Sequence, residues 1–211
     1  MSEKRSLIFV ALGDSLTRGF ILYNICRSVS HGIPYTSHLD KMVVTELSKR
    51  SWDHIEVDFL NLGINGDTTD GMRRRLERQV APLKPDYVII WGGINDLYWG
   101  TPLNIVMENL KETYDKTIEI GARPLACTLT SVLGFDQILI QIQKMNALIM
   151  ESCIERGIPV ADLYGATSNE DGKLKKAYSS DEVHLSGEGY AAVASTIFSD
   201  MVWPILEDIG T

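Results

Sequence analysis

Short runs of apolar residues, rich in β-branched side chains, alternate along this chain with longer segments in which apolar residues recur every three or four positions. This alternation predicts a parallel sheet covered by helices, because a helix after each strand returns the chain to the edge where the next parallel strand begins. Strands are expected at residues 7–12, 55–60, 87–91, 124–128 and 159–162. Helices are expected between and after them, at residues 37–50, 69–81, 102–120, 136–156 and 186–209.

Turn-forming residues support these boundaries. The turn Lys84-Pro85-Asp86 precedes the third expected strand, and Gly121 and Gly157 lie shortly before the fourth and the fifth. The expected fold class is therefore α/β: a three-layer α/β/α sandwich built on a flavodoxin-like five-stranded parallel sheet. Two stretches, residues 20–35 and 164–183, fit neither pattern and are expected to be irregular loops.

Length and composition are those of one soluble globular domain spanning residues 1–211, with 45% hydrophobic and 23% charged residues. The formal net charge of −8 and the pI near 5.0 argue against a nucleic-acid partner, which would require clustered basic residues to neutralise phosphates. One basic cluster, Arg73 to Arg75 with Arg78, has helical spacing and is interpreted as a solvated helix face.

Cysteine content and hydropathy indicate a cytoplasmic location. The three cysteines, Cys26, Cys127 and Cys153, are too scattered for a disulfide framework or a metal knuckle. The apolar run at residues 7–12 is short and lacks the small-residue cleavage pattern of a signal peptide. No stretch approaches the roughly 18 apolar residues that cross a bilayer, so no membrane span is expected.

Polar stretches that contain glycine follow the first three expected strands, and a further polar stretch precedes the last helix. They are residues 13–17, 61–68, 92–96 and 180–186. In an open parallel sheet, ligands bind outside the carboxyl ends of the strands, so these stretches are expected to meet at one rim. Ser15 follows a strand and opens a helix, which places its hydroxyl among unpaired N–H groups. A lone serine there is best interpreted as a helix cap, but its companions favour a nucleophile.

His184 and Asp181 supply what a nucleophilic serine needs. The serine requires a base to take its proton, and the base requires a group that orients it. The two residues are three apart in a turn before a helix, so Asp181 can hold Nδ1 of the imidazole while Nε2 faces Ser15. Taken alone, the pair fits a helix cap and a packed histidine equally well. No metal site is expected, because the other histidines show no ligand spacing with His184.

A tetrahedral intermediate also needs hydrogen-bond donors for its oxyanion. Gly66 is one candidate because no Cβ shields its N–H, and Asn95 is another because its side chain carries an amide. The N–H of Ser15 is the third. In isolation, Gly66 and Asn95 would be interpreted as a turn glycine and an Asx turn. Asp14 and Asp96 are expected to support the site by fixing backbone amides in these loops.

At these residues the chain resembles the GDSL, or SGNH, hydrolase family. The family residues Ser, Gly, Asn and His match Ser15, Gly66, Asn95 and His184, in blocks 13–16, 61–68, 93–96 and 181–184 that follow the family's order. The resemblance implies a three-layer sandwich and esterase, lipase, thioesterase or acetyl-ester hydrolase activity on a small-molecule ester, without a cofactor. It also implies oxyanion donors from the Ser15 and Gly66 N–H groups and the Asn95 side chain. Residues 20–35 are where the sequence departs from the family pattern.

The expected reaction is a two-step acyl transfer. Ser15 attacks the ester carbonyl as His184 takes its proton, and water activated by the same histidine then hydrolyses the acyl-enzyme. Two alternatives remain open: an acyltransferase that uses an alcohol in place of water, and a noncatalytic flavodoxin-like binding domain. A homo-oligomer also remains open, since the apolar segment 201–209 can pack on the core or on a second copy.

Aromatic residues are candidates for a wall beside the substrate. They are Tyr23, Tyr35, Trp91, Tyr98 and Trp99. Most aromatic side chains in such a domain belong to the core, but Tyr98 and Trp99 follow the Asn95 block closely enough to favour the rim.

Overall fold

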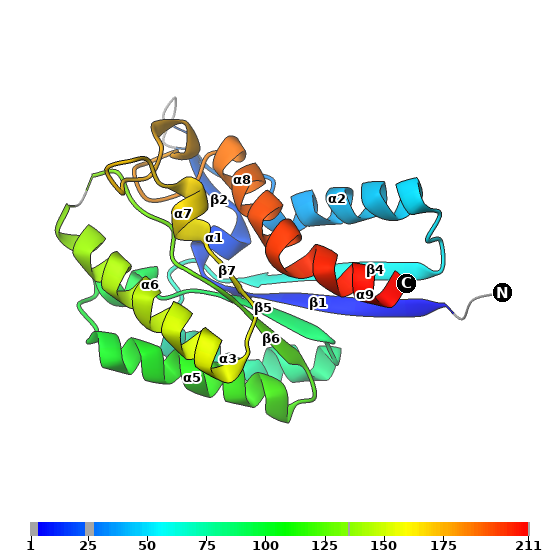
Figure 1. Ribbon diagram of the computed structural model, residues 1–211. Coiled ribbons are helices and arrows are strands. Elements are labelled where there is room, and N and C mark those ends of the chain that lie inside the picture. Colours follow the sequence, from blue (N-terminus) through cyan, green and yellow to red (C-terminus); the bar gives the residue numbers. More distant parts are fainter. Residues whose placement is uncertain (1–3, 24–27, 135, 211) are drawn as a thin grey trace.

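The computed structural model describes residues 4–23, 28–134 and 136–210, with a five-stranded sheet at the centre (Figure 1). The strands are β1 (Arg5–Gly13), β4 (Ile55–Gly63), β5 (Tyr87–Trp91), β6 (Arg123–Cys127) and β7 (Val160–Ala161). Every pairing among them is parallel, in the spatial order β4-β1-β5-β6-β7. This is the order of a flavodoxin-like sheet, and it confirms the predicted fold class.

The middle strands are apolar because both of their faces are covered. All five side chains of β5 are buried. In β1, Phe9 is fully buried and lies between Phe59 and Tyr87, with ring centroids at 5.1 and 4.8 Å. A strand buried on both faces has a continuous apolar run rather than an alternating one, and that run is the pattern by which the sequence predicts β5.

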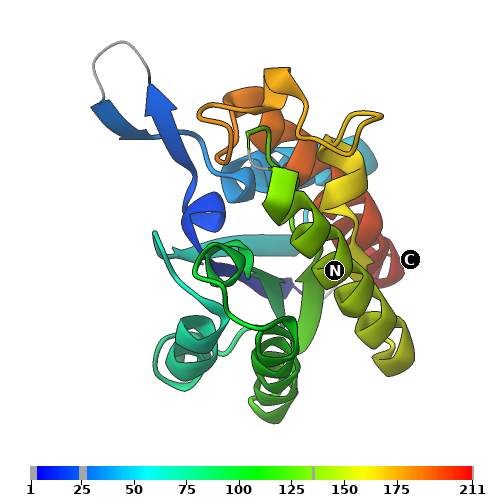
Figure 2. The same ribbon diagram turned by 90° about the vertical axis from the view of Figure 1, so that its left-hand side faces the viewer.

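Helices cover both faces of the sheet (Figures 1 and 2). On one face lie α2 (Tyr35–Arg50), α8 (Gly187–Ile197) and α9 (Trp203–Gly210), and on the other lie α3 (Thr69–Arg75), α5 (Leu103–Glu119) and α6 (Asp136–Arg156). The expected helices at 37–50, 102–120 and 136–156 agree with α2, α5 and α6 to within two residues at each end.

The other two expected helices are not continuous α-helices. Residues 69–81 form α3, then a π-helical turn at Leu76–Val80 and a 3-10 turn at Ala81–Leu83. Residues 186–209 form α8 and α9 with a π-helical turn, Phe198–Val202, between them. A π turn of five residues is too short to be told from the flanking α-helix by its apolar pattern, so it leaves little trace in the sequence.

The C-terminal helix α9 packs on the body of the protein. Leu206 is fully buried, the Trp203 ring stacks on Trp52 with centroids 5.9 Å apart, and the Arg50 guanidinium lies 4.2 Å from the Trp203 ring centre. Packing within the chain therefore accounts for much of the apolar character of segment 201–209.

Residues 20–35, expected as an irregular loop, include an antiparallel hairpin. β2 (Phe20–Tyr23) pairs with β3 (Ser28–His31), and the hairpin projects from the rest of the fold (Figure 2). The sequence prediction was wrong here because four-residue strands are too short to show a periodicity. Cys26 lies in residues 24–27, outside the described residues.

Short helices begin where three of the strands end. They are α1 (Ser15–Arg18) after β1, α4 (Ile94–Tyr98) after β5 and α7 (Leu163–Thr167) after β7. Most of the stretch 164–183 is irregular, as expected, apart from α7 and a 3-10 turn at Lys176–Tyr178. The helix expected to open at Ser15 is confirmed as α1. One or two helical turns carry too few residues for a helical pattern, so α4 and α7 were not predicted from the sequence.

In the described ranges 4–23, 28–134 and 136–210, no helix is both long and apolar enough to cross a membrane. The same residues contain no group of three His, Cys, Asp or Glu side chains gathered as a metal site. Cys127 and Cys153 are free and buried, and burial raises the pKa of both thiols, so they act as neutral core groups.

The packing of α6 gives a matched test of the core. Ile149 is fully buried in this helix and Ile154 is 73% exposed. Ile149→Ala should lower the free energy of unfolding by about 2–5 kcal/mol, because it leaves a cavity under the sheet. Ile154→Ala should change it by less than about 0.5 kcal/mol. Urea unfolding measures both, and equal losses at the two positions would contradict this placement of α6.

Candidate active site

The carboxyl ends of three neighbouring strands meet at one rim of the sheet. In the register of β1 with its neighbours, Gly13 lies opposite Gly63 of β4 and Trp91 of β5. The chain reaches Ser15, Gly66 and Asn95 within a few residues of these aligned strand ends. The structure thus brings these three predicted residues to the same edge, as strand register requires.

Ser15, His184 and Asp181 form one hydrogen-bonded chain. The Ser15 hydroxyl lies 3.0 Å from Nε2 of His184, and Nδ1 of the same ring lies 2.7 Å from Oδ2 of Asp181. These distances are within the normal range for hydrogen bonds, and Ser15 is only 6% exposed. The structure therefore joins the three predicted residues in the arrangement in which a base can take the serine proton.

The turn before α8 fixes the imidazole. The backbone N–H groups of Val183 and His184 both donate to Oδ1 of Asp181, at 3.2 and 2.6 Å, so one carboxylate holds the backbone and the ring together. Burial alone would raise the pKa of Asp181, but the hydrogen bonds from His184 outweigh it, and the pKa of the carboxyl lies below its ordinary value. Asp181 is thus held ionised beside the imidazole.

Phe20 packs against the imidazole and is a site residue that the sequence did not indicate. The ring centroids of Phe20 and His184 are 4.3 Å apart. The Tyr190 hydroxyl of α8 donates to the Phe20 carbonyl at 2.9 Å, which ties the start of the hairpin to the helix that follows His184. Phe20 lies in the stretch expected to be irregular, and a single aromatic residue there gives no signal of such a contact.

The loop after β4 carries the second candidate donor. Gly66 has a positive φ of 74°, a conformation that favours glycine, and it is exposed to solvent. The third candidate donor, Asn95, contacts the same loop, because its Nδ2 donates to the carbonyl of Asp67 at 2.8 Å. An amide nitrogen has two protons, so this bond orients the Asn95 side chain and leaves one proton for another acceptor.

Asp14 caps helix α1 from a buried position. Its Oδ1 accepts from the Leu16 N–H at 2.9 Å, whereas its Oδ2 is buried without a hydrogen-bond partner among the described residues. Burial raises the pKa of Asp14 from 3.8 to about 7, although the Leu16 bond and the nearby His184 lower it. The carboxyl therefore binds a backbone amide of α1 and holds a proton below neutral pH, and its supporting role in the site stays a prediction.

Asp96 also fixes a backbone amide, as predicted. Its two carboxylate oxygens accept from the Thr69 N–H at 2.9 Å and from the Thr69 hydroxyl at 2.8 Å. Burial raises the pKa of Asp96, against the effect of these hydrogen bonds. The contacts join α4, which carries Asn95, to the first turn of α3.

The basic cluster of α3 is only partly a solvated face. The Arg74 side chain is 70% exposed and that of Arg73 is 25% exposed, but the Arg75 side chain is only 6% exposed. Arg75 donates from Nε to Oδ2 of Asp67 at 2.8 Å and from Nη2 to the carbonyl of Gly13 at 2.9 Å. The interpretation of the whole cluster as solvated was therefore wrong for Arg75, which reaches inward to the rim.

The candidate aromatic wall divides into core and rim residues. Tyr35 and Trp91 are fully buried and contact each other with centroids 5.7 Å apart, so neither can line a substrate site. Tyr98 is 39% exposed and Trp99 is 80% exposed at the end of α4. The side chain of Tyr23 lies outside the described side chains.

The charges of Asp181 and Glu182, in the turn that carries His184, act on the Tyr98 hydroxyl. Burial, together with these two charges, raises the pKa of Tyr98 to about 12. The ends of α4 and of the turn that carries His184 therefore lie near each other, and Tyr98 remains a neutral phenol there.

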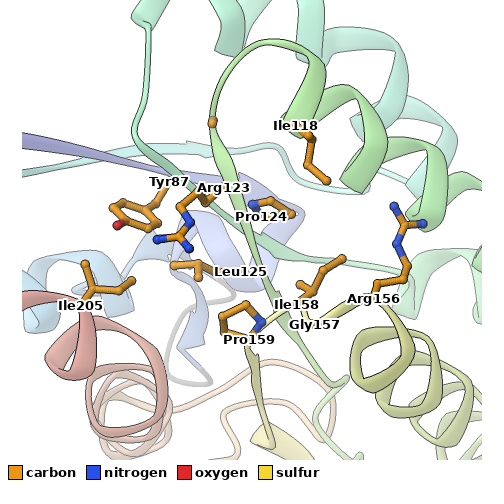
Figure 3. Close-up of a pocket in the computed structure, with 11 residues that line it drawn as sticks. Tyr87, Ile118, Arg123, Pro124, Leu125, Arg156, Gly157, Ile158, Pro159 and Ile205 are labelled. Carbon is orange, nitrogen blue, oxygen red and sulfur yellow. The ribbon is translucent and has the colours of Figure 1, made fainter. Parts of the chain in front are cut away.

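A pocket at the amino ends of the strands is separate from this site (Figure 3). It has a volume of about 360 Å³ and is lined at the amino ends of β6 and β7 by Arg123, Pro124 and Pro159. Its lining contains neither a histidine nor a carboxylate. The residues able to perform acid–base chemistry gather at the carboxyl ends of the strands instead.

The buried acid Asp14 gives a testable dependence of stability on pH. Because the folded-state pKa lies above the ordinary 3.8, the folded protein binds a proton that the unfolded chain releases, so stability falls as pH rises from about 4 to 7. Asp14→Asn removes this effect. From pH 5 to pH 8, the variant should gain roughly 3 kcal/mol of unfolding free energy relative to the wild type.

Urea unfolding at the two pH values measures this difference. Asp70→Asn is the control, because hydrogen bonds from Arg73 lower the pKa of Asp70 and its effect on stability is complete above pH 5. Its offset from the wild type should stay constant between pH 5 and pH 8. A constant offset for Asp14→Asn as well would show that Asp14 is not protonated in the folded protein.

Comparisons with known proteins identify the family of this chain. The model of the GDSL-like lipase/acylhydrolase family matches residues 11–192 of the chain. The platelet-activating factor acetylhydrolase IB subunit alpha2 of Homo sapiens is 24% identical over 158 residues, and the rat protein is equally similar. The matched residues are 71% of this chain and 66% of that relative, so the match spans just under two thirds of the relative's length.

Solved structures share the fold at low sequence identity. An acetylxylan esterase from Geobacillus stearothermophilus has a TM-score of 0.72 and 20% identity, with 94% of each chain covered. A GDSL-like lipase from Bacteroides thetaiotaomicron has a TM-score of 0.68 and 19% identity, with 95% of this chain and 89% of that chain covered. Since the family model spans most of its length, this chain belongs to the GDSL-like lipase/acylhydrolase family.

Proposed function

We propose that this protein hydrolyses carboxylic esters of small molecules through an acyl-enzyme formed on Ser15. One observation carries the proposal: Ser15 Oγ lies 3.0 Å from His184 Nε2, and His184 Nδ1 lies 2.7 Å from Asp181 Oδ2. A serine hydroxyl is a weak nucleophile at neutral pH, and a hydrogen bond to an oriented imidazole is the usual means of activating it. Membership of the lipase/acylhydrolase family supports the same reaction class.

In the acylation step, Ser15 Oγ attacks the ester carbonyl carbon while its proton moves to Nε2 of His184. The carbonyl π electrons move to the oxygen, which becomes the oxyanion of a tetrahedral intermediate. Collapse of the intermediate breaks the bond to the alcohol oxygen, which takes the proton from His184 and leaves. Asp181 holds the Nδ1 proton in place and stabilises the imidazolium that exists during the step.

In the deacylation step, water takes the place of the alcohol. His184 removes a proton from the water as it attacks the acyl carbonyl, a second tetrahedral intermediate forms, and Ser15 leaves with the proton returned from Nε2. The products are the carboxylic acid and free enzyme. Each proton in the cycle is held by this chain's own residues or by water, so the proposed reaction needs no cofactor.

Donors around the serine would stabilise both intermediates. The N–H of Ser15 belongs to the first turn of α1, where backbone N–H groups have no partner within the helix. The exposed N–H of Gly66 and the second amide proton of Asn95 are the other proposed donors. Loss of one donor of this kind typically lowers kcat by about 10²–10³-fold.

The relatives and the exposed rim support short acyl groups on an apolar or cyclic alcohol. Two of the similar proteins are named for acetyl groups, the acetylhydrolase subunit and the acetylxylan esterase. In this chain Ile64, Tyr98 and Trp99 expose apolar surface on the loops that carry Gly66 and Asn95. Such surface suits the alcohol portion of an ester, because sugar rings and alkyl groups both pack on aromatic faces.

The nucleophile assignment is tested by Ser15→Ala with p-nitrophenyl acetate as substrate. We expect kcat/KM to fall by at least ~10³-fold, because the acyl-enzyme can no longer form, while the melting temperature stays close to that of the wild type. Ser48→Ala, at an exposed position of α2, is the matched control and should retain full activity. Retention of turnover by Ser15→Ala would exclude Ser15 as the nucleophile.

A further inference from the structure

The guanidinium of Arg75 is buried and hydrogen-bonds to residues adjacent to the proposed oxyanion donors. Its side chain is 6% exposed, and the side chain of its partner Asp67 is 10% exposed. A charged group removed from water to this extent is costly unless its partners satisfy it fully. Each nitrogen of Arg75 accordingly has a partner: Nε bonds to Asp67, Nη2 to the Gly13 carbonyl and Nη1 to Gln79 at 3.2 Å.

The two shortest of these bonds reach two different chain segments next to the proposed oxyanion donors. Gly13 is the last residue of β1 and precedes Ser15 by two positions. Asp67 directly follows Gly66, and its carbonyl accepts the hydrogen bond from the Asn95 amide. One guanidinium therefore connects the strand that presents the nucleophile with the loop that carries one donor and orients another.

The surrounding backbone leaves room for this connection. A Cβ at Gly71 would come within 2.0 Å of Oδ1 of Asp67, so a side chain at position 71 would displace the carboxylate. The Gly13 carbonyl also accepts from the Ile64 N–H at 3.0 Å, which adds a direct bond between the same two segments. Arg75 lies at the junction of α3 with the π-helical turn Leu76–Val80, a local irregularity of the kind often found at functional sites.

We propose that Arg75 is a positioning residue, which acts through Asp67 to hold the Asn95 amide at the correct place relative to Ser15. The inference rests on the proposed ester hydrolysis, since Asn95 has a defined task only if an oxyanion forms. Small displacements of a donor matter, because a shift of about 1 Å can cost ~10²-fold in rate. Arginine is required because its planar fork binds a carboxylate and a carbonyl together, and lysine is a single point charge.

A double-mutant cycle tests whether Arg75 acts through Asn95. The variants are Arg75→Lys, Asn95→Ala and the combination, with kcat/KM for p-nitrophenyl acetate as the readout. We expect Arg75→Lys to lower kcat/KM by ~10–100-fold and Asn95→Ala by ~10²–10³-fold. The double variant should be less than about threefold worse than Asn95→Ala, because the amide that Arg75 positions is already absent.

Controls separate this result from a purely structural role. Arg74→Lys, at the exposed neighbouring position, should keep activity within about twofold of the wild type. Melting temperatures are measured for every variant, since loss of packing alone would lower stability and multiply with the effect of Asn95→Ala. Asp67→Asn is the second route to the same cycle if Arg75→Lys does not fold, and it should show the same dependence on Asn95.

The outcomes are distinguishable. Losses that multiply in the double variant would overturn the role of Arg75 and leave the proposed ester hydrolysis intact. Full activity of Asn95→Ala would instead overturn the oxyanion assignment on which the role of Arg75 depends. Loss of activity in Arg75→Lys that disappears in the Asn95→Ala background is the result that supports the proposal.

Discussion

The parallel pairing of β1 with β4 on one side and β5 on the other is the constraint on which the candidate site depends. It aligns Gly13 with Gly63 and Trp91, so the chain leaves the sheet at three adjacent strand ends. The segment after each strand contributes one residue with a proposed role: Ser15 at the start of α1, Gly66 in the loop after β4, or Asn95 in α4. A shift of one strand by one residue would turn its buried side chains toward the wrong face, so the apolar core that fixes the register also fixes the site.

The histidine arrives from a different part of the chain and needs its own support. His184 lies in the turn before α8, far from β1 in sequence, and Asp181 holds both its ring and its backbone. The contact of Phe20 with the imidazole and the bond from Tyr190 to Phe20 join this turn to the hairpin that follows α1. The imidazole of His184, the proposed base, is therefore held by Phe20 of the hairpin as well as by Asp181 of its own turn.

Several polar groups behind the site hydrogen-bond to neighbouring protein groups. Asp96 binds Thr69, and Arg75 binds Asp67 and Gly13, so α3, α4 and β1 are linked below the rim. Asp14 differs from these groups: one of its oxygens is buried and has no partner in the described part of the chain, and burial raises its pKa to about 7. A proton on this carboxyl avoids a further buried negative charge beside Asp67 and Asp96.

The sequence predicts the sheet and the residues of the proposed catalytic triad, Ser15, His184 and Asp181, because both leave strong local patterns. Strands buried on both faces are continuous apolar runs, and the polar stretches that follow them mark the rim. The sequence gives no comparable local pattern for the role of Arg75. An arginine in a run of three has the pattern of a solvated helix, and its burial depends on where α3 sits against the end of β1, which is a property of the tertiary fold.

Two other features escape sequence reasoning for related reasons. The hairpin of β2 and β3 consists of strands too short to show a period, so it was expected as a loop. Trp91 and Tyr35 were candidates for a substrate wall as aromatic residues, but both are buried, Trp91 in β5 and Tyr35 at the start of α2. The direction of a side chain at a strand end is set by register, and register is not encoded in a single motif.

The central claim is that Ser15, Gly66 and Asn95 converge on one oxyanion while His184 faces the serine. A crystal structure of the protein inactivated with an organophosphonate ester tests it most directly, because the phosphonyl group mimics the tetrahedral intermediate. The account predicts phosphorus bonded to Ser15 Oγ, with one phosphonyl oxygen about 2.7–3.1 Å from the Ser15 N–H, the Gly66 N–H and Nδ2 of Asn95. An adduct on another residue, or an oxygen that points away from these three donors, would contradict it.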